Sequence, residues 1–144
     1  MRLGPKQLAP AIRAYQETIP ACTPVGGVVN HQIGAFAICG IEKDYSVGRD
    51  IAGAASRWYF GDNQSPLQAH RFDSQEQLRL SNDQLIEQGI IIGGDADSVC
   101  RGIERWKNAG IDTLLLMLGA GNTTHEQVMR GLDILGEQVM PKFK

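Results

Sequence analysis

The chain has 144 residues, of which 42% are hydrophobic and 21% charged, which is typical of a globular domain with a core of its own. Its formal net charge is −2 and its Lys and Arg residues are scattered, which argues against a nucleic-acid partner or a membrane surface. The longest apolar run, residues 114–118, is far shorter than the roughly 20 residues that a membrane span needs.

The first half of the chain predicts a helix, a strand and a second helix. The first helix is expected to begin near Pro10 and to end at Pro20. Its buried side chains, at helical spacing, are expected to be Leu8, Ile12, Tyr15 and Ile19. Residues 33–41 (IGAFAICGI) are apolar on both faces, which is typical of a covered parallel strand. The second helix is expected from 47 to 60, with Asp44 or Ser46 as its cap. Its buried stripe is expected to be Val47, Ile51, Ala54 and Trp58.

Residues 61–84 form an irregular insertion between the two halves. Ser74 and Gln77 have the spacing of a capping box, so a short helix is expected there. An insertion of this length in a compact domain is often a lid or an interface, and a solvated excursion is the simpler alternative.

The second half predicts a helix, a strand and a final helix. The acidic and capping residues 95–98 favour a helix start, and Gly110 is the expected end. Residues 113–118 form the second strand, and 90–92 are a possible third. The turn GAGNTT (119–124) then leads to the final helix, for which Thr123 and Glu126 form a capping box. The final helix is expected to bury Val128, Leu132, Leu135 and Val139.

This alternation predicts an α/β fold with a parallel sheet and right-handed crossovers. Two strands, or three with 90–92, leave the edges of such a sheet without neighbours. The sequence therefore predicts that residues 1–144 are a single partial domain of a larger sheet.

The turn after strand 113–118 is the main candidate site. It directs backbone N–H groups and a helix N-terminus beyond the strand, which favours an anion, and an ordinary βα turn is the alternative. Thr124 stands where a dinucleotide fingerprint needs a third small residue, so a nucleotide-binding domain is disfavoured. His125 begins the final helix, as a pocket residue or as a surface residue. Residues 93–95 (GGD) suit helix capping better than phosphate binding.

The three cysteines, Cys22, Cys39 and Cys100, form no CxxC pattern. We expect them to be buried free thiols in a reducing compartment, with no structural metal. Residues 1–10 lack the apolar core of a signal peptide, so a cytoplasmic location is expected.

Several segments, taken in order, resemble the luciferase-like flavin-dependent monooxygenase family. GGDADSVCRGIERWKNAGIDTLLLML is similar to the family's glycine, capped helix and apolar strand. THEQVMRGLDILGEQVMPKF is similar to its closing helix, and IRAYQETI, PVGGVVN and IGAFAI also match. The ordered set carries the resemblance, and the insertion is its weakest part.

The resemblance implies the C-terminal part of a (β/α)₈ TIM-type barrel, from the helix before strand seven to the closing helix. The cofactor implied is reduced FMN, or the deazaflavin F420, with a flavin reductase as a possible source of the reduced flavin. The reactants implied are O₂ and a small organic substrate.

The residues expected to contact the cofactor are Gly119, Gly121, Asn122 and His125. The glycines would let the backbone approach the ligand, and the other two would make polar contacts; no catalytic residue is assigned. Such a part is expected to be inactive alone, and to complement a missing N-terminal part or to oligomerise. The alternative is a non-catalytic α/β assembly module that oligomerises through its open sheet edges.

Overall fold

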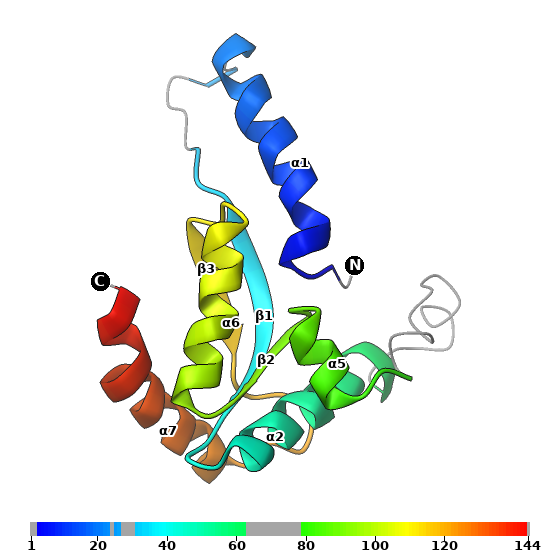
Figure 1. The fold of residues 1–144 in the computed structure, drawn as a ribbon, viewed down its shortest axis with the longest axis vertical. Coiled ribbons are helices and arrows are strands. Elements are labelled where there is room, and N and C mark those ends of the chain that lie inside the picture. Colours follow the sequence, from blue (N-terminus) through cyan, green and yellow to red (C-terminus); the bar gives the residue numbers. More distant parts are fainter. Residues whose placement is uncertain (1–2, 24, 27–30, 63–78, 144) are drawn as a thin grey trace.

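The computed structural model describes residues 3–23, 25–26, 31–62 and 79–143. Three parallel strands form one sheet in the order β2-β1-β3 (Figure 1). The helices that accompany them are α1 (Pro5–Thr18), α2 (Tyr45–Arg57), α5 (Asn82–Glu87), α6 (Ala96–Asn108) and α7 (His125–Ile134). Shorter helical segments are η1 (Ile19–Ala21), η2 (Trp58–Asp62), η3 (Leu135–Val139) and η4 (Met140–Phe143). The short helix expected near Ser74 lies outside the described residues.

The central strand of the sheet is β1 (Gly34–Ile41), as the sequence predicts. Its residues 38–41 pair with β2 (Ile91–Gly94), and its residues 34–38 pair with β3 (Thr113–Met117). Within the described residues, β3 therefore has no neighbouring strand on its outer edge. The edge of β1 that pairs with β2 at residues 38–41 is likewise unpaired at residues 34–37. The prediction of a parallel sheet with open edges is confirmed for the described residues.

Apolar side chains pack in two clusters, one on each face of the sheet. On the first face, Ala37, Cys39 and Ile41 pack with side chains of α6 and of the α7–η3 run, including Trp106 and Val139. Helices α6 and α7 therefore cover this face of β1.

The second face is only partly covered. Ile38 packs there with side chains of α2 and α5, across the carboxyl half of the strands. Nearer the amino ends, Phe36 and Leu115 lie side by side in register and are 42% and 63% exposed. Within the described residues, the expectation that both faces of these strands are covered is thus wrong at the amino half.

The helix α2 buries a different stripe from the predicted one. Val47 and Ala54 are exposed, whereas Gly48, Ala52 and Ala55 are buried. A Cβ added to Gly48 would lie 2.8 Å from the carbonyl carbon of Gly94, so the helix backbone lies almost against β2. Small side chains permit this close approach, and the larger side chains of the predicted stripe do not.

Two predicted helix starts are also corrected. The helix α1 begins at Pro5 rather than near Pro10, because the N–H of Gly4 bonds to Gln7 Oε1 at 2.8 Å and a proline suits the first helical position. Pro10 lies inside the helix at an exposed position. The helix α7 is capped by Thr124 with Gln127, one residue after the predicted pair. The side chain of Thr123 instead donates to Ala120 O at 2.8 Å within the turn.

Within these helices, some side chains that were predicted to be buried are exposed. Tyr15 in α1 is 46% exposed and Leu132 in α7 is 47% exposed. Both lie on helix faces that no described element covers fully, which again indicates a fold with open surfaces.

Candidate functional site

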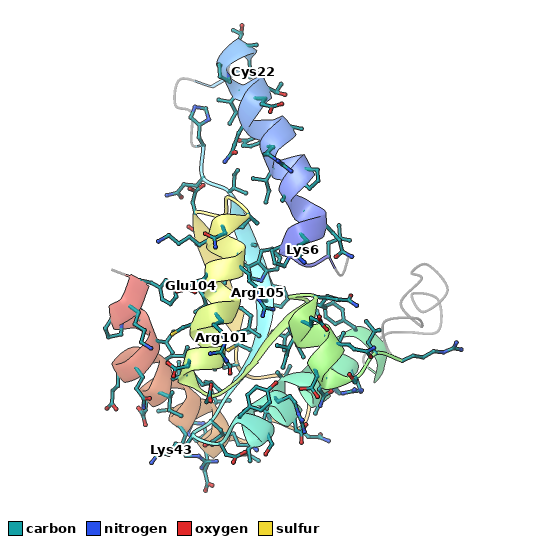
Figure 2. All side chains as sticks on the ribbon, viewed as in Figure 1. Lys6, Cys22, Lys43, Arg101, Glu104 and Arg105 are labelled. Carbon is teal, nitrogen blue, oxygen red and sulfur yellow. The ribbon has the colours of Figure 1, made fainter. Side chains whose placement is uncertain are left out.

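The carboxyl ends of the three strands meet at one end of the sheet, the lower end in Figure 1. The segment 42–44 follows β1, Asp95 follows β2, and the turn 119–124 follows β3. Lys43 marks this end in Figure 2. Parallel α/β proteins keep their functional sites here, because the loops of several strands converge.

Gly121 has a structural role in the turn. Its φ of +61° is in the left-handed region, and an added Cβ would lie 2.8 Å from Cβ and Cγ of Trp58. The turn therefore packs against the indole at the end of α2, and glycine is required there whether or not a ligand binds. The neighbouring Ala120 is buried in the same cluster.

The other predicted site residues, Gly119, Asn122 and His125, are exposed. Within the part of the chain that the structure describes, the side chains of Asn122 and His125 have no hydrogen-bond partner. His125 and Glu126 occupy the first turn of α7, where backbone N–H groups lack partners inside the helix. The turn therefore presents free donors at the carboxyl end of β3.

These donors lie on an open surface. Two recesses are lined by described residues, one of about 870 Å³ beside β3 and one of about 450 Å³ near the ends of β1 and β2. Neither is lined by Gly119, Gly121, Asn122 or His125. In the described part of the chain, the turn is thus an exposed surface outside both recesses.

The smaller recess is polar, and most of its charges are paired. Arg130 Nε donates to Glu42 Oε1 at 2.6 Å, and Lys142 Nζ lies 3.0 Å from Asp97 Oδ1. Asp95 accepts a bond from the N–H of Ser98 at 2.8 Å and caps α6, as predicted for residues 93–95. These contacts fasten α6, α7 and η4 to the ends of the strands.

The ionic contacts at this end predict that stability depends on pH. The hydrogen bond from Arg130 lowers the pKa of Glu42, and the bonds from Ser98 lower the pKa of Asp95. Carboxyls with lowered pKa values stabilise the folded state above their unfolded pKa, about 4, and this contribution is lost as the pH falls further. We expect the urea midpoint to fall on acidification from about pH 5 to pH 3, and to fall less in Glu42→Gln. An identical fall in the two proteins would contradict the role of Glu42.

Three aromatic side chains on the second face of the sheet were not predicted as functional. The rings of Phe36 and Tyr59 are 5.8 Å apart, and those of Tyr59 and Phe60 are 5.0 Å apart. Tyr59 is 39% exposed, so part of this cluster faces outward beside the exposed Leu115. The run WYF at 58–60 directly after a helix was the sequence signal that could have indicated an aromatic surface.

Among the described residues, no group of His, Cys, Asp and Glu could hold a metal ion, and no helix is long and apolar enough to cross a membrane. Cys39 and Cys100 are buried free thiols, as predicted, and burial raises the pKa of Cys39 to about 12. Cys22 was predicted to be buried but is exposed, because it follows α1 at the end that extends away from the sheet (Figure 2).

The comparisons with known proteins show what this arrangement resembles. The chain has the α/β fold of an incomplete (β/α)₈ barrel, with parallel strands and flanking helices, as the sequence predicts. It is similar to the monooxygenase RslO1 from Streptomyces bottropensis, with a TM-score of 0.72 and 19% identity over 97% of this chain and 39% of that one. It is also similar to the coenzyme F420 dependent tetrahydromethanopterin reductase from Methanopyrus kandleri, with a TM-score of 0.56 and 21% identity over 98% of this chain and 43% of that one.

The chain thus spans 39% and 43% of the lengths of these two proteins. No protein-family model and no curated protein matches it.

Proposed function

We propose that the chain is part of a luciferase-like, flavin-dependent oxidoreductase that uses reduced FMN and O₂ to oxygenate a small organic substrate. The observation that carries this proposal is the likeness of the fold to a monooxygenase over 97% of the chain. The second structural neighbour, a coenzyme F420 dependent reductase, supports a flavin-type cofactor. The ordered sequence resemblance described above agrees with both.

The exposed donors after β3 suit the phosphate of FMN. The amide of Asn122, the ring of His125 and the N–H groups of the first turn of α7 can all donate to an anion, and the helix dipole favours negative charge there. Among the described residues, Val128 Cγ2 at 3.5 Å is the one atom near the Cβ position of Gly119, so the backbone there is open to a ligand. When bound, reduced FMN would supply electrons to O₂; the proposed role of these residues is to bind and orient it.

The rest of a flavin pocket has to come from other polypeptide. The described residues supply one exposed wall, and the sheet has open edges. We therefore propose that the chain is inactive alone, that it works with strands outside residues 1–144, and that a separate reductase in the cytoplasm supplies the reduced flavin.

We expect replacement of Asn122 by Ala to weaken the binding of reduced FMN about tenfold or more, because a hydrogen bond to a charged group contributes about 1.5–3 kcal/mol. His125→Ala is expected to act in the same direction. The measurement is an anaerobic titration of reduced FMN, and separately of reduced F420, into the chain alone and into the assembly purified from its own cells. Glu137→Ala, an exposed change in η3, is the control and should leave the affinity unchanged.

Tighter binding of F420 than of FMN would mean that F420 is the cofactor and that it binds at the same residues. Binding of neither, in the chain or in the assembly, would overturn the proposed function. The second candidate is a non-catalytic assembly module, favoured by the free edge of β3 and the exposed Leu115. A discrete dimer in gel filtration, without flavin affinity, would support that candidate.

A further inference from the structure

We propose that the outer edge of β3, together with the apolar groove beside it, is a docking surface for a parallel β-strand and its flanking helix from outside residues 1–144. The groove is the recess of about 870 Å³ on the first face of the sheet. This inference rests on the proposed function, since it names the kind of polypeptide that completes the sheet.

The edge of β3 calls for a strand as its partner. Within the described residues β3 pairs only with β1, so its other edge presents unpaired backbone donors and acceptors. Exposed edges in soluble proteins usually carry Lys, Pro or a bulge that prevents pairing, and the sequence of β3, TLLLM, carries none of these. Leu115 is 63% exposed on the second face, so an added strand would also cover an apolar side chain. The natural occupant of this edge is another strand.

The groove beside β3 fits the apolar face of a helix that would lie next to the added strand. Its floor consists of Leu114, Leu116 and Leu118, which follow the first face of β3. Its walls include side chains from α6, α7, η3 and η4, among them Ile103, Leu132, Val139, Met140 and Phe143. Met140 is 63% exposed. An amphipathic helix binds a groove of this kind through apolar residues that recur at helical spacing.

Charge at the rim adds a requirement on that helix. Lys107 lines the groove and is exposed, and within the described ranges no carboxylate pairs with it. Asp112, also on the rim, already accepts a bond from the N–H of Ile33 at 2.8 Å. The docked helix is therefore expected to place an acidic side chain near Lys107.

A second copy of the chain fits this surface less well. Two copies related by a two-fold axis through β3 would pair their strands antiparallel, whereas both pairings within this sheet are parallel. In the two structural neighbours, the matched part is only 39% and 43% of the chain, so more than half of each protein is further polypeptide. The occupant is thus assigned to polypeptide of the same assembly.

Site-specific photocrosslinking tests this assignment. The crosslinking amino acid p-benzoylphenylalanine is placed at Leu115, at Met140 or, as the control, at Val47, which is 46% exposed on α2 and away from the edge. The full chain is irradiated in its own cells, and the crosslinked peptides are sequenced. We expect adducts from 115 and 140 and none from 47.

The crosslinked peptides decide the outcome. Peptides from outside residues 1–144 that read as an apolar strand joined to an amphipathic helix support the proposal. Adducts to residues 113–117 of a second copy, adducts to a segment of another kind, or no adduct at 115 and 140 overturn it. Flavin binding without these adducts would support the proposed function and contradict the docking surface. The adducts without flavin binding would support the docking surface and contradict the proposed function.

Discussion

Gly40→Ala is expected to lower the free energy of unfolding by about 3 kcal/mol, at the upper end of the usual cost of overpacking. Gly40 lies in β1 beneath α2, and an added Cβ would be 2.5 Å from the carbonyl oxygen of Gly48 and 2.9 Å from Cα of Ala52. Both atoms belong to the helix backbone and cannot rotate away as a side chain would. The whole of α2 would have to move off the sheet.

Urea unfolding, followed by circular dichroism, measures this effect. Gly136→Ala is the matched control, because nothing lies within 4 Å of the Cβ position of Gly136 in η3. The control is expected to be neutral or to stabilise the protein by up to about 1 kcal/mol, since Ala loses less conformational entropy than Gly in a helix. A cost below about 1 kcal/mol for Gly40→Ala would show that α2 does not lie against β1 as closely as described.

The second large effect is expected at Trp106, the indole in the core of the first face. Its side chain is 2% exposed and packs within the larger apolar cluster. Trp106→Ala would leave a large cavity between α6 and the sheet, so we expect a loss of about 3–5 kcal/mol. The effect should be seen as a lower urea midpoint with the remaining Trp58 as the fluorescent probe.

Trp106→Phe separates packing from polarity at the same position. Among the described residues, the buried Nε1 of Trp106 has no hydrogen-bond partner, and a buried donor without a partner is unfavourable. Phenylalanine keeps most of the ring and removes this N–H, so we expect a cost below about 1.5 kcal/mol. Equal losses for the two variants would mean that the indole N–H has a partner that contributes to stability.

The two predictions concern opposite faces of one sheet, and they show how differently these faces are built. The first face carries large side chains, such as Trp106, between strands and helices. On the second face, the backbone of α2 lies close to the sheet, with Gly48 and Ala52 of the helix against Gly40 of β1. The loss of stability therefore comes from a cavity in Trp106→Ala and from a backbone clash in Gly40→Ala.

Much of the fold follows from local patterns in the sequence. The apolar runs at 33–41 and 113–118 predict β1 and β3, and the capped helical patterns after 95 and after 123 predict α6 and α7, the latter with its cap one residue too early. These predictions hold because apolar periodicity and capping act within one element and its immediate neighbours. The same reasoning predicted a parallel sheet with open edges, which the strand pairing confirms.

Other features depend on contacts between distant segments. Two sets of residues on α2 have helical spacing. The set of small residues is the buried one, because it faces Gly40 of β1 and Gly94 of β2, which leave room for the helix backbone. Gly121 was expected to approach a ligand, but its positive φ and its contact with Trp58 give it a role in packing. The order of the strands, with β1 at the centre, also lies beyond any local pattern.

The sequence by itself therefore determined which segments are strands and helices, and that they form a parallel α/β sheet with open edges. Only the tertiary structure decided which face of α2 is buried, that the turn 119–124 is an open wall, and where the uncovered edge and groove lie. The physical reason is that hydrophobicity and capping are properties of short segments. Close approach and exposure depend on which residues from elsewhere in the chain occupy the same space.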